Sequence, residues 1–464
     1  MPFSPERLAA EVDRHLAHID RPPSGLCVAL SGGLDSTVLL VALARLRDSA
    51  RYGPLRAIHV NHGLHADAER WLADCRALCA RFTVPFDQAT VDAHPVGGES
   101  PEAAARRARY AALRERLDDA EALITAHHAD DQLETVLLQW IRGGGLRAIA
   151  GMPPIARFGR GWHLRPLLAF TRADLETWAR GSRLAWLEDP SNEDRRFDRN
   201  FLRHDVLPLL RRRWPATART VARVASQAAE ALEVADAVAL SDAAGAADGE
   251  TLSLQRLGVL PPPRRRAALR AWLRAQSLPV PSAATLATLE HDMFHAADDR
   301  IPRVNWPGAE VHRYRGHLYA AIPLEGAAPV EGAWRPGEAF DLGPVGRLEF
   351  VAATGVGLSR ARLPAELRIR AGSPGESFRP AGSVHRRPLR KWLQERGILP
   401  WLRPYLPRVA SGDALVAIGD LACEAAFAAD PGEPSWRIVW HDRPTLSEGD
   451  ATSVCAVART GPIR

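Results

Sequence analysis

Short apolar runs alternate with helical patterns along the first part of this sequence. The runs predict strands at 25–30, 55–61, 84–89 and 121–126, and the segments after them predict helices at 35–47, 66–81, 101–117 and 130–142. Buried βα repeats of this length predict an α/β fold with a doubly wound parallel sheet. Ligands bind such sheets at the carboxyl ends of the strands. Polar clusters at those ends are therefore candidate sites.

A glycine-containing turn follows the first predicted strand. Residues 31–36 read Ser-Gly-Gly-Leu-Asp-Ser, and a helical pattern follows. Backbone N–H groups of such a turn, together with a helix N-terminus, can close around an anion. Ser31 and Ser36 add hydroxyl donors, and Asp35 suits a magnesium ion held between it and phosphates. The turn lacks the Gly-Lys-[Ser/Thr] ending of a Walker loop, which favours pyrophosphate as its ligand. The alternative is an ordinary strand-to-helix turn capped by serine.

Further polar clusters lie at other predicted strand ends. His59 and Asn61 end the second strand, and His127 and His128 precede Asp130, Asp131 and Glu134 after the fourth. We expect these clusters and the glycine turn to converge on one crevice. Carboxylates there could hold magnesium on ATP, bind an amine or take a proton from it. They could also be acids that only decorate a helix N-terminus, where the helix dipole favours them.

Two arginines share one face of the helix predicted at 101–117. Arg106 and Arg109 are three residues apart, which is a helical spacing. Arginines can neutralise charge that builds up on a triphosphate during displacement. The alternative is a solvated surface of an amphipathic helix.

Composition narrows the class of protein. A length of 464 residues suggests about three domains. The five cysteines are odd in number and widely spaced, which argues against a disulfide framework and for a reducing compartment. The amphipathic N-terminus is not a signal peptide, and no run is long and apolar enough to span a bilayer. We therefore expect a cytoplasmic protein with no membrane partner.

Positive charge is concentrated near the C-terminus. The chain has a net charge of +5, and the stretch from Arg368 to Arg408 holds ten basic residues against two acidic ones. Such a patch suits a polyanion; the alternative is a solvated surface in an arginine-rich protein. The single lysine of the chain, Lys391, lies within this stretch.

Changes in composition predict the domain organisation. We expect an N-terminal nucleotide-binding domain at 1–213 and a helical middle domain at 214–324. A segment rich in Gly, Pro and Ala at 325–365 predicts a linker with strand pieces. A small basic α+β domain would follow at 366–440, and a tail at 441–464.

The order of the motifs carries a resemblance to a known family. The turn at 31–36 resembles the pyrophosphate loop of the N-type ATP pyrophosphatases, the PP-loop class of adenine nucleotide alpha hydrolase-like folds. Within that class the chain resembles the tRNA(Ile)-lysidine synthetase family along nearly its whole length. The motifs that carry this resemblance are HVNHGL at 59–64, EAAARRARY at 102–110, AHHADDQLET at 126–135, RGGG at 142–145, RPLL at 165–168, WLEDPSN at 186–192, RNFLR at 199–203, WPG at 306–308, RYR at 313–315, RPAG at 379–382 and LRKWLQE at 389–395.

The resemblance implies a two-step reaction on tRNA. ATP, with Mg²⁺, would activate C2 of the wobble cytidine of a tRNA(Ile) with a CAU anticodon, and the amine of free L-lysine would then displace AMP. The product, lysidine, changes codon reading from AUG to AUA. A homodimer is possible.

The resemblance also implies roles for individual residues. ATP binding is carried over to Ser31, Gly32, Gly33, Leu34, Asp35, Ser36, His59 and Asn61. The resemblance implies that the catalytic residues are Asp35, Arg106, His127, Asp131 and Glu134. Of these, Asp35 and Glu134 would bind the metal ion. The tRNA-binding residues would be Arg109, Arg203, Arg379, Arg386, Arg387, Arg390, Lys391 and Trp392. The division of magnesium binding, lysine recognition and amine activation among His127, Asp131 and Glu134 stays open.

Three other functions compete with this reading. A tRNA thiolation enzyme would share the loop but usually carries sulfur on paired cysteines, and Cys75 and Cys79 are four residues apart within a predicted helix. A non-catalytic tRNA-binding protein would not need Asp35, Asp131 and Glu134. An amidotransferase would need a glutaminase segment, which the sequence does not contain.

Overall fold

The computed structural model describes residues 2–47, 52–61, 67–92, 94, 101–188, 194–297, 300–324, 330–373 and 375–446. Motif residues 62–64 and 189–192, the side chain of Glu102 and the tail from residue 447 lie outside the described residues. The chain divides into two compact units, Met1–Ala235 and Asp236–Arg464. Each unit is described below by itself.

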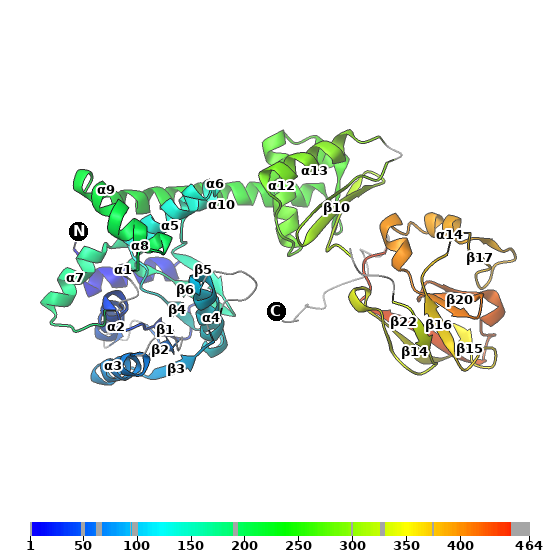
Figure 1. Cartoon of the computed structure of the whole chain (residues 1–464), viewed down its shortest axis with the longest axis horizontal. Helices are drawn as coiled ribbons and strands as arrows, with labels where there is room; N and C mark the ends of the chain where they lie inside the picture. The colour runs from blue at the N-terminus through cyan, green and yellow to red at the C-terminus, as the bar shows by residue number, and fades with distance from the viewer. Residues whose placement is uncertain are drawn as a thin grey trace. The chain divides into compact units, whose positions relative to one another are not determined.

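The first unit is built on a six-stranded sheet with the order β3-β2-β1-β4-β6-β5 (Figure 1). The strands are β1 (Leu26–Ala29), β2 (Leu55–Asn61), β3 (Phe86–Thr90), β4 (Ala122–Ile124), β5 (Ile155–Phe158) and β6 (Gly161–Leu164). All neighbouring pairs are parallel except β5 with β6, which is antiparallel. The predicted α/β fold with a parallel sheet is therefore confirmed.

Helices follow or precede each strand of this unit. They are α1 (Pro5–Leu16), α2 (Leu34–Arg47), α3 (Ala68–Arg81), α4 (Pro101–Arg116), α5 (Ala129–Ile141), α6 (Gly145–Ala150), α7 (Arg172–Gly181), α8 (Asp198–Phe201), α9 (Leu207–Arg213) and α10 (Thr217–Ala246), with a 3₁₀ turn at Pro166–Ala169 and a π-helical turn at Leu202–Val206. Helix α10 continues past residue 235 into the second unit.

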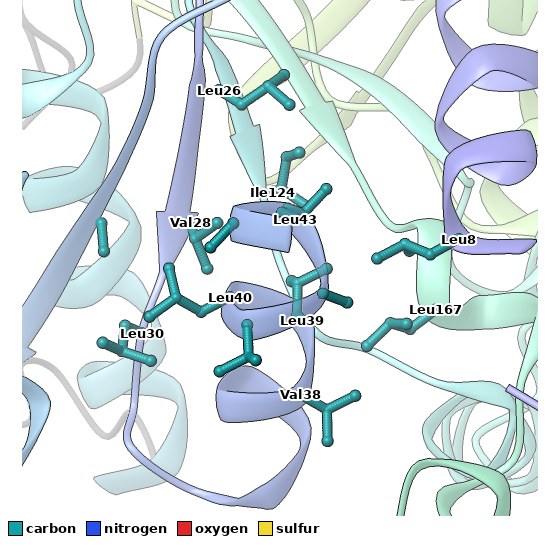
Figure 2. Close-up of a cluster of buried hydrophobic side chains, with 14 of the residues drawn as sticks. Leu8, Leu26, Val28, Leu30, Val38, Leu39, Leu40, Leu43, Ile124 and Leu167 are labelled. Atoms are coloured by element: carbon teal, nitrogen blue, oxygen red, sulfur yellow. The ribbon is translucent and has the colours of Figure 1, made fainter. Parts of the chain in front are cut away.

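Alternate residues of the strands face two different hydrophobic layers, as the period of a strand requires. Leu26 and Val28 of β1 face a core shared with α1, α2 and the 3₁₀ turn, whereas Cys27 faces Leu113 of α4. Figure 2 shows the first layer, with Leu39 of α2 among the labelled side chains. Helix α2 is apolar on nearly all sides because it packs against both the sheet and the helices α1 and α7. This packing holds the N-terminus of α2, and so the glycine turn, in place.

The second unit begins with helices and an antiparallel sheet. Its helices are α11 (Leu254–Gly258), α12 (Pro262–Ala275) and α13 (Ala283–His295), and its strands are β7 (Ala247–Asp248), β8 (Thr251–Ser253), β9 (Arg303–Trp306), β10 (Ala309–Tyr314) and β11 (His317–Ala321). The five strands pair in the order β7-β8-β11-β10-β9. The middle region was predicted to be a helical domain; its helices are present, but the sheet was not predicted.

The rest of the second unit is rich in strands. The strands are β12 (Gly332–Trp334), β13 (Phe340–Asp341), β14 (Arg347–Thr354), β15 (Leu358–Ser359), β16 (Leu367–Arg370), β17 (Ser377–Phe378), β18 (Arg387–Pro388), β19 (Arg408–Ser411), β20 (Ala414–Ile418), β21 (Ala422–Cys423) and β22 (Pro434–His441), and the helix is α14 (Leu389–Glu395). They form sheets with the orders β12-β16-β19-β20-β21, β13-β14-β22-β15 and β17-β18.

The described part of the predicted segment 325–365, residues 330–365, contains the predicted strand pieces, but it is not a linker. Strand β14 pairs with β22 from Arg347↔His441 to Thr354↔Pro434, and Trp334 is buried in the same core. The glycines serve tight turns between short strands: Gly346 has a φ of 96°, and an added Cβ would lie 2.1 Å from the carbonyl oxygen of His441.

The predicted tail also begins too early. Leu446 is fully buried, and its carbonyl oxygen accepts a hydrogen bond of 2.9 Å from the backbone N–H of Leu399. The folded part of the second unit therefore extends to Leu446, which is part of its core. None of the helices in the described residues is both long enough and apolar enough to span a bilayer.

Candidate nucleotide-binding and catalytic site

The glycine turn is held in one conformation by its own hydroxyl groups. The Oγ of Ser36 accepts a hydrogen bond from the backbone N–H of Ser31 at 3.2 Å and donates one to the carbonyl of Gly33 at 3.1 Å. Gly32 has a φ of 84°, and an added Cβ would lie 2.6 Å from Leu187 and 2.9 Å from the sulfur of Cys75. Only glycine fits this position, because both the backbone conformation and the space exclude a side chain.

A cavity of about 560 Å³ opens at the carboxyl ends of β1, β2 and β4. This volume lies within the usual range of small-ligand pockets. The polar residues that line it are Ser31, Gly33, Asp35, Ser36, His59, Asn61, Arg109, Tyr110, Thr125 and His127, and apolar walls come from Leu30, Ile58, Val60 and Trp71. The structure therefore brings the glycine turn, the end of β2 and His127 together around one cavity, whereas Asp131 and Glu134 are not among the lining residues.

His128 connects the glycine turn to helix α5. Its Nε2 lies 3.5 Å from Asp35 Oδ2 and 3.4 Å from Asp131 Oδ2. Burial lowers the pKa of His128, but the carboxylates of Asp131, Asp35 and Asp130 more than offset this and raise it to about 9. His128 belongs to the polar cluster predicted after the fourth strand, but no individual role was predicted for it. Its position directly before the helix, where it acts as the N-cap, was the available signal.

Asp35 has one oxygen that suits a metal ion. Its Oδ1 is buried and makes no hydrogen bond within the described residues, whereas its Oδ2 faces His128. A carboxylate oxygen without a hydrogen-bond donor is a suitable ligand for Mg²⁺. The described part of the chain contains no group of three or more His, Cys, Asp or Glu side chains that could hold a metal ion by itself.

Glu134 lies in an ion-pair cluster rather than beside Asp35. Its side chain is 1% exposed, Arg199 donates to Oε2 at 2.7 Å, and Arg203 donates to Oε1 at 2.8 Å and to Oε2 at 2.9 Å. Because both oxygens bind guanidinium groups, the predicted metal-binding role of Glu134 is not supported in this conformation. Arg203, predicted to bind tRNA, is likewise engaged here.

Asp131 belongs to the same cluster. Arg199 donates to its Oδ1 at 3.1 Å, and the backbone N–H of His128 donates to its Oδ2 at 3.0 Å. Burial raises the pKa of Asp131, but His128 and Arg199 lower it well below its usual range. Sequence analysis missed Arg199; the four-residue spacing in Arg199-Asn-Phe-Leu-Arg203 was the signal that both arginines share a helix face.

Arg106 and Arg109 both lie near the ring of Tyr110. Their guanidinium carbons are 5.1 Å and 5.4 Å from its centroid. Arg109 lines the cavity, whereas Arg106 is exposed and is absent from the cavity lining. The shared helix face was predicted correctly, but only one of the two side chains reaches the cavity wall.

His127 belongs to a chain of buried polar groups. Its Nδ1 lies 2.7 Å from Thr125 Oγ1, which lies 2.8 Å from His163 Nε2. Arg165 donates to His163 Nδ1 at 3.0 Å. Burial lowers the pKa of His127 to about 3, with Arg165 adding to this effect and Asp131 opposing it. His127 is therefore a neutral imidazole at the cavity wall.

The basic residues of the second unit are partly engaged in ion pairs. Arg386 pairs with Glu424 at 3.2 Å, and Arg387 pairs with Glu395. Arg390 and Lys391 are exposed on α14, and Arg379 is also exposed. Arg386 is exposed as well, so four of the predicted tRNA-binding side chains of this unit reach solvent.

Trp392 does not lie on that surface. It is 3% exposed and packs edge-to-face on Phe378, with ring centroids 5.1 Å apart. The predicted tRNA-binding role of Trp392 is therefore not supported. On α14 it faces the core, while the preceding Arg390 and Lys391 face solvent, as helical geometry requires of a short amphipathic helix.

Comparisons with known proteins cover all three predicted functional regions. Family models match a PP-loop domain at residues 6–210, a TilS substrate binding domain at 252–319 and a TilS substrate C-terminal domain at 367–440. Among solved structures, the chain is similar to the U34-tRNA thiolase NcsA from Methanococcus maripaludis, with 17% identity and a TM-score of 0.40 over 48% of this chain and 78% of that one. That likeness is too low to carry an argument.

Curated relatives match nearly the whole chain. A tRNA(Ile)-lysidine synthase from Alkalilimnicola ehrlichii is 42% identical over 437 residues, which are 93% of this chain and 96% of the relative. Enzymes with the same name from Coxiella burnetii and Methylococcus capsulatus are 36% and 39% identical, over 94% and 88% of this chain and 96% and 94% of theirs. With this identity and coverage, the chain belongs to the tRNA(Ile)-lysidine synthase family.

Proposed function

We propose that this chain ligates free L-lysine to C2 of the wobble cytidine in a tRNA(Ile) with a CAU anticodon. ATP would adenylate the cytidine with release of pyrophosphate, and the lysine amine would then displace AMP. One observation carries the proposal: the glycine turn, Asp35 and His127 meet at a single cavity in a chain that matches lysidine synthases over 93% of its length.

ATP fits the two kinds of lining that the cavity offers. The glycine turn presents backbone N–H groups and serine hydroxyls at the N-terminus of α2, which suits the phosphates. The apolar walls, including Ile58 and Trp71, suit the adenosine.

The unpartnered Oδ1 of Asp35 would hold a magnesium ion. That ion, when bound, would neutralise phosphate charge as pyrophosphate leaves.

The acidic cluster on α5 suits recognition of lysine. Asp131 and Glu134 are buried or half-buried carboxylates already paired with the cations Arg199 and Arg203. An ammonium group of the substrate would bind there in exchange with a guanidinium group. The amine that attacks must lose its proton first, which requires an acceptor near this cluster.

The nearest rival function, transfer of sulfur, has less support. Cys75 and Cys79 are buried, and burial raises the pKa of both thiols to about 12. A sulfur carrier needs an accessible thiolate.

The four described cysteines are free, which is consistent with the cytoplasmic location that we propose. The homodimer stays a prediction, which sedimentation equilibrium of the purified chain would test.

Transfer of labelled lysine tests the function directly. Purified protein would be mixed with ATP, Mg²⁺, labelled lysine and an unmodified CAU-anticodon tRNA(Ile) transcript. We expect acid-precipitable label with the wild-type chain and at least a 100-fold lower rate with Asp35→Asn, which keeps the shape of the side chain but removes its charge.

Two further measurements, thermal unfolding and AMP release, complete this experiment. Thermal unfolding of Asp35→Asn checks that the fold is retained. Release of AMP that depends on tRNA, without incorporation of lysine, would retain adenylation but contradict lysine as the nucleophile. The absence of both label and AMP release would overturn the whole proposal.

A further inference from the structure

A buried chain of hydrogen bonds leads from Arg165 to the wall of the cavity. It runs through His163 and Thr125 to His127, with successive separations of 3.0, 2.8 and 2.7 Å. His163 and Thr125 are 2% and 6% exposed, so water does not compete for these contacts. The chain joins His163 of β6 and Thr125, which directly follows β4, to His127 at the cavity wall.

The direction of every proton in this chain follows from its first member. Arginine has only donors, so the N–H of Arg165 must meet a ring nitrogen of His163 that carries no proton, and that nitrogen is Nδ1. Burial and the charge of Arg165 lower the pKa of His163 strongly, so its ring is neutral. The single proton of the ring therefore resides on Nε2, which donates to Thr125 Oγ1.

Thr125 continues the same direction of hydrogen-bond donation towards His127. Its oxygen accepts from His163, and its hydroxyl proton needs an acceptor because an unmatched buried hydroxyl is costly. Within the described residues, the Thr125 hydroxyl has one other partner, His127 Nδ1. The proton of Thr125 therefore points to that nitrogen.

We propose that Arg165, His163 and Thr125 are positioning residues that hold His127 as the neutral tautomer with its proton on Nε2. The rings of Phe158 and Tyr110 support this arrangement by packing against His163, each with a centroid distance of 5.8 Å. Nδ1 of His127 is occupied by Thr125, so Nε2 is the ring nitrogen left for a ligand in the cavity.

This tautomer decides what His127 can do in the reaction. An Nε2–H group donates a hydrogen bond, so His127 would stabilise negative charge on a phosphate oxygen as pyrophosphate or AMP leaves. It cannot accept the proton of the lysine amine, because its one basic nitrogen already accepts from Thr125. This consequence rests on the proposed function; the tautomer itself does not.

Nuclear magnetic resonance of the full-length protein labelled with ¹⁵N-histidine tests the proposal. Long-range ¹H–¹⁵N spectra distinguish a protonated ring nitrogen from an unprotonated one. We expect a single His127 tautomer, protonated at Nε2, in the wild-type chain without substrates. Thr125→Val removes the donor to Nδ1 while keeping the side-chain shape, and we expect it to give a mixture of tautomers.

The matched control is Thr125→Ser, which keeps the hydroxyl and should keep the wild-type spectrum. In the lysine-transfer assay, Thr125→Val should lower kcat by about 10-fold or more with little change in the KM for ATP, and Thr125→Ser should restore kcat. A second variant, His163→Gln, offers an acceptor to Arg165 and a donor to Thr125, and should keep the His127 tautomer.

A His127 ring protonated at Nδ1 in the wild-type chain would overturn the proposal. So would a Thr125→Val spectrum that matches the wild-type spectrum. If the spectra agree with expectation but the wild-type chain transfers no lysine, the proposed function fails while the tautomer assignment stands.

Discussion

At the scale of single residues, the charged neighbours of two buried histidines give them opposite pKa shifts. His128 is buried among carboxylates, which raise its pKa to about 9, whereas His127 is buried beside arginine and has a pKa lowered to about 3. Neighbouring positions in the sequence therefore carry different charges at neutral pH. The cause is the set of groups that tertiary packing brings to each ring.

His15 offers a measurable consequence of such burial. It lies on α1, is 6% exposed, and its Nδ1 makes no hydrogen bond within the described residues. Burial lowers its pKa to about 4, with the charges of Arg14 and His18 adding to the effect. Because the folded-state pKa lies below the unfolded value, the unfolded chain binds the proton first, and stability is lost as pH falls from about 6.5 towards 4.

We expect His15→Leu to remove this loss. Between pH 7 and pH 5, the free energy of unfolding of the wild-type chain should fall by about 2 kcal/mol more than that of the variant. Urea unfolding at both pH values measures the difference. His127 and His163 have the same sign of shift but occur in both proteins, so they cancel. Equal pH dependence in the two proteins would contradict the prediction.

At the scale of elements, α14 separates a core face from a basic face within seven residues. Leu389, Trp392 and Leu393 are buried, while Arg390 and Lys391 are exposed. We expect Arg390→Ala and Lys391→Ala each to weaken tRNA binding and to lower the slope of log K against log salt concentration by about 1, since each would remove one phosphate contact.

Filter binding at several salt concentrations measures this slope. The matched control is Arg437→Ala, which removes an exposed arginine of β22 from the same unit and should leave the slope unchanged. If the control lowers the slope as much as the α14 variants do, the effect is one of net charge and the binding surface is not on α14.

At the scale of the whole molecule, the cavity belongs to one unit. All of its lining residues, and the main core that supports the sheet, lie within Met1–Ala235. A unit with its own hydrophobic core is expected to fold alone. We therefore expect a fragment of residues 1–235 to unfold cooperatively and to bind ATP within about 3-fold of the full chain, and to bind tRNA far more weakly.

Circular dichroism on heating and equilibrium dialysis with ATP measure these properties. The same fragment with Asp35→Asn is the control, because it should fold equally well but bind Mg²⁺-ATP more weakly. A fragment that folds but does not bind ATP would show that the second unit contributes to the nucleotide site.

The sequence by itself determined the local architecture. Strand β2 has the predicted bounds, and the convergence of strand ends on one cavity followed from the parallel βα pattern alone. These features depend on residues near one another in the chain, through periodicity, caps and turns. A resemblance carried by ordered motifs added the family, which the comparisons confirmed.

Only the tertiary structure decided which side chains are buried and with whom they pair. Glu134 pairs with Arg199 and Arg203, which lie 65 and 69 positions later in the chain. The burial of Trp392 needed Phe378 and the core around it, and β14 needed β22, whose paired residues come 80 or more positions later. Charge pairing and burial depend on spatial neighbours, which no local pattern specifies. For that reason the position of the site could be predicted, but not the ion pairs and hydrogen bonds that set its chemistry.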